Sequence, residues 1–189
     1  MGCSLEGPEA FEAAFSDNFA RVHRFLARRV GTTLADDLAA ETFAVAFRRR
    51  RTFDPTLGNA RAWLFGITTN LLRAHWREEQ HLLSLEARTV PEAGPPADGD
   101  DQALARWVAP QLAQALGVLS QDQRDVLLLH AWADLSNEEI ASALGVPTGT
   151  IRSRLSRARG ELRDYLGSFD FDLWLFDEMD APTLKEREK

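Results

Sequence analysis

The sequence is poor in cysteine and has no long hydrophobic run. Its one cysteine, Cys3, excludes an internal disulfide, and a zinc site built on thiolates would need several cysteines. No apolar stretch approaches the roughly 18 residues that cross a bilayer. The first residues also lack the basic start and apolar core of a signal peptide. We therefore expect a cytoplasmic protein with no direct membrane insertion.

The motifs of common enzyme classes are missing as well. The sequence contains no phosphate-binding loop, no nucleophile elbow and no cluster of residues with metal-ligand spacing. His75 and Glu79 share a helical face, but His81 falls off it, so this group is predicted to be a solvated helix end. No catalytic residue, cofactor or metal site is predicted, and an enzyme is kept only as a competing class.

The charge of the chain is unevenly distributed. Hydrophobic residues make up 44% and charged residues 27% of the sequence, as in folded soluble proteins, and the net charge is −7. Residues 21–88 nevertheless carry twelve Arg against seven acids, and five further Arg lie between Arg152 and Arg163 against Glu161 alone. Acidic segments flank these two basic blocks. The distribution therefore favours a nucleic-acid partner despite the negative total.

One segment divides the chain into two parts. Residues 89–105 hold three Pro, two Gly and four acids without periodic apolar residues, which is typical of a flexible linker. Helical periodicity prevails on both sides of this segment. The predicted fold is all-α, with two small helical domains at residues 1–88 and 106–166 and an acidic, aromatic C-terminal extension at 167–189.

Clear helix signals mark the second domain. Two capping boxes, in which a hydroxyl residue is followed three positions later by Gln or Glu, are Ser120 with Gln123 and Ser136 with Glu139. The helix that follows the second box is short and stops at Gly145. A third helix begins near Thr148 and runs to about Leu166. Two helices joined by a tight turn with Gly predict a helix-turn-helix.

The third helix of this domain has an unusual surface. Its apolar stripe, which must be buried, consists of Ile151, Leu155, Ala158, Leu162 and Tyr165. The opposite side carries small residues, namely Gly149, Ser153, Ser156 and Gly160. Arginines flank these small residues on both sides. A solvated Arg-rich helix is the simpler interpretation, but the small face between Arg flanks favours a helix that enters the DNA major groove.

The first domain contains a comparable helix over about residues 60–77. A polar strip separates two apolar stripes and consists of Gly66, Asn70, Arg73 and Arg77. This strip is a candidate for contact with nucleic acid beside an aromatic platform. For Trp63, on one of the apolar stripes, we expect core packing instead.

The preceding helix, over about residues 34–50, is apolar nearly all round. Phe43 and Phe47 lie on one face, and Leu38 lies on another beside Asp37 and Glu41. Both faces cannot be core in so small a domain, so one should meet a partner, and the acids indicate a basic one. We expect Phe47 to be core and the acidic face to meet the partner.

Four segments resemble the ECF (extracytoplasmic function) sigma factors of bacterial RNA polymerase. Residues 36–43 (DDLAAETF) are similar to the family's core-polymerase-binding helix, and residues 62–70 (AWLFGITTN) to its promoter-melting segment. Residues 135–141 (LSNEEIA) and 149–159 (GTIRSRLSRAR) are similar to its upstream-element helix-turn-helix. The resemblance covers about residues 9–166. It departs where the family's Leu-Pro is Leu119-Ser120, and the C-terminal extension has no counterpart.

The resemblance implies a fold, partners and binding residues. The protein would bind core RNA polymerase through the clamp of the largest subunit, and it would recognise and melt promoter DNA. An anti-sigma factor would regulate it. It would have no catalytic residues of its own. The polymerase contacts would be Asp37, Leu38, Glu41, Thr42 and Phe43. The minus-ten contacts would be Phe53, Asp54, Asn59, Asn70, Arg73, Trp76 and Arg77, with a flipped base held by the loop at residues 53–59. The minus-thirty-five contacts would be Thr148, Thr150, Arg152, Ser153, Arg154, Arg157 and Arg159.

Two further questions stay open at the level of sequence. A helix-turn-helix regulator that works without polymerase would usually dimerise on paired half-sites, but no heptad repeat or symmetric interface is evident. The extension at 167–189 joins large apolar side chains to acids, which is untypical of disorder. It is predicted either to cap the core of the second domain or to dock on an Arg-rich surface through Phe171, Trp174 and Leu175.

Overall fold

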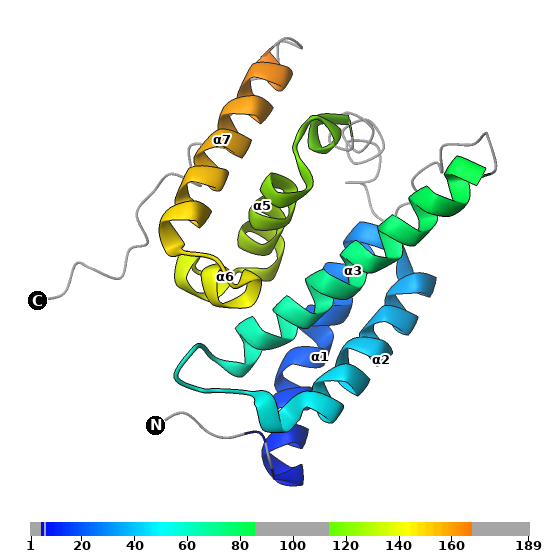
Figure 1. Cartoon of the computed structure of the whole chain (residues 1–189), viewed down its shortest axis with the longest axis vertical. Coiled ribbons are helices and arrows are strands. Elements are labelled where there is room, and N and C mark those ends of the chain that lie inside the picture. Colours follow the sequence, from blue (N-terminus) through cyan, green and yellow to red (C-terminus); the bar gives the residue numbers. More distant parts are fainter. Residues whose placement is uncertain (1–4, 6, 86–113, 168–189) are drawn as a thin grey trace, which may run out of the picture.

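The described part of the chain is built of helices. The computed structural model describes residues 5, 7–85 and 114–167, and no strand occurs among them, which confirms the all-α prediction. The helices are α1 (Pro8–Val30), α2 (Thr32–Arg49), the 3-10 turn η1 (Arg50–Thr52), α3 (Ala60–Leu85), α5 (Gln121–Ala133), α6 (Asn137–Leu144) and α7 (Thr148–Gly167) (Figure 1). None of the described helices is long and apolar enough to cross a membrane. The predicted linker and the extension from residue 168 lie outside the described residues.

Helices α1, α2 and α3 form an N-terminal bundle. Gly31, with φ of +79°, separates α1 from α2 and allows the chain to reverse within one residue. The inner faces of the three helices meet in a core that includes Val22, Phe25, Leu26, Ala35, Ala39, Ala46, Leu64, Phe65 and Leu72. Trp63 is half-buried and packs against this core, as expected. Helix α3 continues past its predicted end at Arg77 to Leu85.

Helices α5, α6 and α7 form a C-terminal group that agrees with the sequence signals. Both predicted capping boxes are present, and Gly145 ends α6 in the left-handed conformation with φ of +66°. Along α7 the buried residues are Ile151, Leu155, Ala158 and Leu162, as predicted, whereas Tyr165, the last residue of the predicted stripe, is half-buried. The helix-turn-helix geometry therefore follows from caps and periodicity in the sequence.

The prediction that Phe47 belongs to the core is wrong. Phe47 is 46% exposed, whereas Phe43 on the same face of α2 is 5% exposed. The ring of Phe47 packs edge-on against Phe11 with centroids 5.2 Å apart, and the Arg50 guanidinium lies 4.1 Å from its centroid. Helix α1 thus covers α2 fully at Phe43 but only partly one turn later.

The two groups of helices contact each other. Helix α6 lies against α3 (Figure 1), and α5 also touches α1. Gly66 of α3 makes this approach possible, because a Cβ atom at that position would lie 2.5 Å from the carbonyl oxygen of Ala143 in α6. The backbones of α3 and α6 therefore touch without an intervening side chain.

Candidate nucleic-acid and partner interfaces

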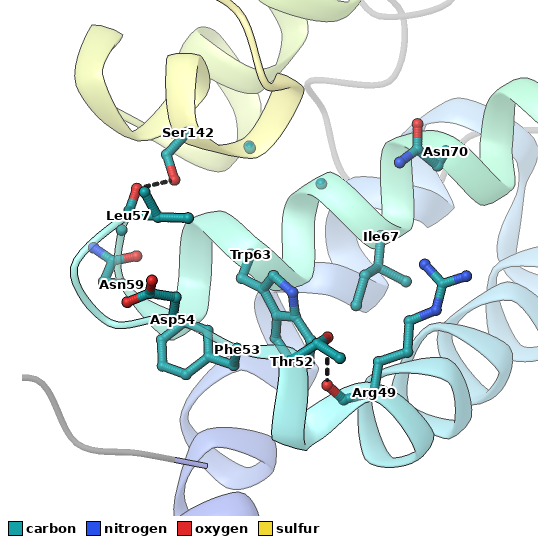
Figure 2. Close-up of a pocket in the computed structure, with 13 residues that line it drawn as sticks. Arg49, Thr52, Phe53, Asp54, Leu57, Asn59, Trp63, Ile67, Asn70 and Ser142 are labelled. Carbon is teal, nitrogen blue, oxygen red and sulfur yellow. Dashed lines mark hydrogen bonds between the residues drawn. The ribbon is translucent and has the colours of Figure 1, made fainter.

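The loop between η1 and α3 lines a pocket of about 240 Å³ (Figure 2). Phe53 is 9% exposed, and its ring packs against Trp63 with centroids 5.4 Å apart. Four of the predicted minus-ten residues line this one pocket, namely Phe53, Asp54, Asn59 and Asn70. The structure thus brings them together although the sequence separates Asn70 from the loop.

Local hydrogen bonds fix the shape of the loop. Asp54 Oδ1 accepts from the backbone N of Thr56 at 2.8 Å and from its hydroxyl at 2.7 Å, which lowers the pKa of Asp54. Asn59 Oδ1 accepts from the backbone N of Ala62 at 2.8 Å and so caps the start of α3. Its Nδ2 donates to Glu139 Oε1 of α6 at 2.6 Å. The Asn59 side chain therefore both caps α3 and links the loop to the C-terminal group.

Sequence reasoning missed one wall of the pocket. Ser142 and Ala143 of α6 line it, together with Arg49, Thr52 and Ile67 from the N-terminal bundle. Figure 2 shows Ser142 reaching the loop from above, where its hydroxyl donates to the carbonyl oxygen of Leu57 at 2.5 Å. No periodicity could have indicated this contact, because α6 is far from the loop in the sequence.

The remaining predicted minus-ten residues lie further along α3 and do not line the pocket. Arg73 pairs with two aspartates of α5. Trp76 is half-buried beneath the guanidinium of Arg29, whose Cζ lies 4.4 Å from the ring centroid. Arg77 is exposed, and its Nε donates to the carbonyl oxygen of Arg73 at 3.2 Å.

The predicted polymerase-binding residues of α2 divide into two classes. Asp37 and Glu41 are exposed. Leu38, Thr42 and Phe43 are 6%, 0% and 5% exposed. The Thr42 hydroxyl makes its hydrogen bond within the helix, where it donates to the carbonyl oxygen of Leu38 at 2.8 Å. Only the two carboxylates are thus presented to a partner from this set, while the other three hold α2 in the bundle.

Helix α7 presents part of its predicted DNA-binding set to solvent. Arg152, Ser153 and Arg157 are exposed, whereas Thr148, Thr150, Arg154 and Arg159 are half-buried. Ser153 Oγ donates to the carbonyl oxygen of Thr150 at 3.0 Å. Arg152 lies 3.6 Å from Glu138 of α6, and both side chains are about two-thirds exposed. Arg154 differs from its neighbours, because its Nη2 lies 2.6 Å from Asp122 of α5.

Two aspartates of α5 join both groups of helices. Asp125 is fully buried and binds Arg29 at 2.9 Å and Arg73 at 2.6 Å. Asp122 binds Arg73 at 2.8 Å and Arg154 at 2.6 Å. Burial lowers the pKa of Arg73, but Asp125 and Asp122 outweigh it, so the net shift is upward. For Arg29 burial dominates over Asp125 and lowers its pKa.

Among residues 7–78 and 114–167, no group of three or more His, Cys, Asp or Glu side chains could hold a metal ion.

Comparisons with known proteins assign the family. The family models that match are Sigma-70 region 2 over residues 14–81 and Sigma-70, region 4 over residues 110–162. The RNA polymerase sigma factor CarQ of Myxococcus xanthus is 32% identical over 168 residues, which cover 87% of this chain and 94% of that protein. The ECF RNA polymerase sigma factor SigC of Mycobacterium tuberculosis is 36% identical over 155 residues, 81% of each chain. The chain belongs to the ECF sigma factors.

Solved structures of sigma factors share the fold. The sigma factor RpoE of Bartonella quintana, solved in complex with the anti-sigma factor NepR, has a TM-score of 0.64 and 26% identity over 84% of this chain and 98% of that one. CnrH, solved in complex with the cytosolic domain of CnrY, has a TM-score of 0.62 and 25% identity over 87% and 92%. As a sigma factor, the chain directs RNA polymerase to initiate transcription at specific promoters. The two family matches coincide with the two groups of helices.

Proposed function

We propose that the N-terminal bundle binds core RNA polymerase and the minus-ten element, and that α6 and α7 read the minus-thirty-five element. The domain boundaries would be those of the sequence prediction, 1–88 and 106–166, with the linker at 89–105. Support comes from the family matches, because the match at residues 14–81 falls within the first proposed domain and the match at residues 110–162 within the second. The observation that carries the proposal is the pocket at residues 53–59, where four predicted minus-ten residues converge.

The pocket suits an unstacked base of a melted promoter. Phe53 and Trp63 give it an aromatic wall, and a base can stack on such a wall regardless of its identity. Asp54, with its lowered pKa, offers acceptors only, while Asn59 and Asn70 offer both donors and acceptors. Extrusion of a base costs a few kcal/mol, and these contacts would offset part of that cost during melting. Further along α3 lie Arg73, Trp76 and Arg77, which would be near the DNA backbone beside the extruded base.

Helix α7 would lie in the major groove at the minus-thirty-five element. Arg152 and Arg157 are exposed on opposite flanks of the small face and can reach phosphates or guanine edges. Ser153 lies between them on the exposed small face. The half-buried members of the set, Thr148, Thr150, Arg154 and Arg159, would contact DNA at the edges of the helix.

The acidic face of α2 would dock on the clamp of the largest polymerase subunit. Asp37 and Glu41 are exposed in that face and fit a basic partner surface. Regulation by an anti-sigma factor is proposed on the likeness to Bartonella quintana RpoE, which was solved with one. The polymerase and the anti-sigma factor would then be the protein partners, and the promoter the nucleic-acid partner.

The experiment that tests this proposal is transcription from a promoter pool. Core RNA polymerase with the chain would transcribe templates randomised at both promoter elements, and the transcribed templates would be sequenced. We expect two enriched motifs at a fixed spacing, and permanganate should detect unpaired thymines at the minus-ten motif. Absence of enrichment above core polymerase alone would overturn the proposed function.

The variants Arg152→Ala and Arg157→Ala test in the same assay whether α7 reads the minus-thirty-five element. Each should weaken selection at the minus-thirty-five motif only, by about 1 to 3 kcal/mol if the guanidinium makes a bidentate base contact. Arg163→Ala is the matched control, since Arg163 is exposed on the same helix outside the predicted set. Equal effects of all three variants would mean that the arginines act only as a solvated positive face.

A further inference from the structure

We infer that a groove between α5, α6 and α7 is the docking site of the chain's own C-terminal extension, residues 168–189. The extension lies outside the described residues, so the inference rests on the groove and on the sequence of the extension. The docking does not depend on the proposed function. Its consequence for promoter binding does, because Arg152, which lines the groove, belongs to the proposed minus-thirty-five set.

The groove is basic. It has a volume of about 480 Å³, which is within the range of pockets that hold small molecules. Leu155, which is 4% exposed, lines it as an apolar residue. The polar residues that line it are His130 of α5, Asn137 of α6, and Arg152, Ser156, Arg159 and Arg163 of α7. No acid is among the described lining residues, so the groove fits an occupant with several negative charges.

Glu138 of α6 neutralises the groove only in part. It lies 3.6 Å from Arg152, but both side chains are about two-thirds exposed. An ion pair at that exposure is weak, because water screens it. A more acidic occupant can therefore replace Glu138 at Arg152.

A buried acceptor in the groove favours a peptide over DNA as the occupant. Asn137 Oδ1 is buried, and no described residue donates a hydrogen bond to it. Buried acceptors without a donor are rare in folded proteins, so an occupant with N–H groups would complete the site. A peptide backbone carries one N–H at each non-proline residue, whereas the phosphates of a DNA backbone only accept.

The extension has the complementary composition. Residues 168–180 contain no basic residue and five acids, namely Asp170, Asp172, Asp177, Glu178 and Asp180. The same stretch contains Trp174 among other large apolar side chains. Clusters of arginine are a recurrent recognition surface for acidic peptide segments. The groove and the extension therefore attract each other through opposite charge.

The extension also begins close enough to reach the groove. Helix α7 ends at Gly167, about one turn beyond Arg163. From Gly167 back to Arg152 the helix axis measures about 22 Å, at about 1.5 Å per residue. The segment 168–176, if extended, spans about 30 Å at about 3.3 Å per residue. After one reversal of direction, the segment can therefore run along the whole groove.

The spacing of two acids matches that of two arginines. Residues 169–173 alternate between apolar and acidic side chains, which is typical of an extended segment. Asp170 and Asp172 would then project from the same side, about 7 Å apart. Arg159 and Arg163 are four positions apart on α7, with Cβ atoms about 5 to 6 Å apart. Asp170, which comes first after α7, would pair with Arg163. Asp172 would pair with Arg159.

This register places Trp174 in the groove. In an extended segment Trp174 lies on the same side as Asp172, two residues further along. Its indole would pack over Leu155 and beside the guanidinium of Arg152, where a cation–π contact adds to apolar burial. Arg152 cannot contact DNA at the same time. The extension and the promoter would therefore compete for this residue.

A fluorine label on tryptophan tests the docking in the full chain. Fluorotryptophan replaces every tryptophan, and Trp174→Phe identifies the resonance of residue 174 by its loss. A labelled synthetic peptide of residues 168–180 gives the position of the free segment. We expect the Trp174 resonance of the full chain to differ from that of the peptide and not to depend on protein concentration.

Two double variants with the same change of net charge test the register. Asp170→Asn with Asp172→Asn should move the Trp174 resonance to the position of the free peptide. Asp177→Asn with Asp180→Asn should leave it in place, because these acids lie beyond the docked stretch.

A pair of arginine variants tests the groove side of the contact. Arg163→Gln should move the Trp174 resonance toward that of the peptide. Arg157→Gln is the matched control, since Arg157 is exposed on the same helix but does not line the groove, and it should leave the resonance in place.

Three outcomes would overturn the inference. The first is a Trp174 resonance of the unaltered chain at the position of the free peptide. The second is an equal shift in the two double variants, because the contact would then be a general effect of charge. The third is a resonance that depends on protein concentration, because the groove would then hold the extension of a second copy.

Binding of the free protein to a fluorescent DNA duplex of random sequence tests the competition with DNA. We expect Asp170→Asn with Asp172→Asn to bind about tenfold more tightly than Asp177→Asn with Asp180→Asn, equivalent to about 1.4 kcal/mol. If the Trp174 resonance moves as expected while the two affinities are equal, the docking holds and the proposed role of α7 in DNA binding is contradicted. Failure of the docking would leave the outcome of the promoter-pool experiment unchanged.

Discussion

Glu139 is a single residue whose two carboxylate oxygens serve different parts of the chain. Oε2 accepts from the backbone N of Ser136 at 2.8 Å in the capping box of α6, and Oε1 accepts from Asn59 of the N-terminal bundle at 2.6 Å. Partial burial raises the pKa of Glu139, but the bonds from Ser136 and Asn59 outweigh it and lower the pKa below its ordinary 4.5. The stabilisation is therefore complete above that value and is lost as pH falls through the folded-state pKa.

Glu139→Gln should lower the free energy of unfolding by about 1 kcal/mol at neutral pH, because it replaces one of the two acceptor oxygens by an NH2 group, which cannot accept a hydrogen bond. The difference from the unaltered chain should shrink as pH falls, since Glu139 itself becomes protonated there. Urea denaturation at a series of pH values measures both quantities. A difference that stays constant with pH would mean that the charge of Glu139 contributes nothing.

The element that the sequence predicted least well is α2, where the helical period placed Phe43 and Phe47 on one face. Periodicity gives the direction of a side chain but not how far the neighbouring helix covers it. Phe43 lies under Phe15 and Phe19 of α1, with ring centroids 4.7 and 5.7 Å away, whereas Phe47 meets Phe11 near the start of α1. The crossing of α1 over α2 decides which ring is buried, and no local pattern encodes it.

Phe43→Ala should therefore destabilise the protein by about 3 to 5 kcal/mol, the cost of removing a buried ring. Phe47→Ala should cost about 1 kcal/mol, because it loses little more than an aromatic pair at the surface. Thermal denaturation of the two variants gives the comparison. Equal losses would show that α2 buries both rings in solution.

The C-terminal group was predictable because its signals are local. The hydroxyls of Ser120 and Ser136 fix two helix starts, and Gly145 fixes a helix end, each through bonds within a few residues. The stripe on α7 follows from the helical period alone. The same period predicted the direction of the Arg154 side chain. It could not predict the ion pair with Asp122, since Asp122 belongs to another helix.

On the scale of the whole molecule, the sequence predicted two domains and their family but not the contact between them. That contact depends on Gly66 facing Ala143 and on Asp125 facing Arg29, pairs that are far apart in the chain. Two of the predicted DNA-binding residues, Asn59 and Arg73, take part in it. Some of the residues chosen for DNA binding from sequence thus also join the two groups of helices.

The distance between the two helix groups, measured by pulsed electron resonance, tests this account most directly. Spin labels at Arg48→Cys in α2 and Asp164→Cys in α7, in a Cys3→Ser background, report on one exposed position of each group. The free protein should give one narrow distance distribution, because the buried ion pairs of Asp125 join the two groups. A broad distribution, as two helix groups without a fixed contact would give, would contradict the account.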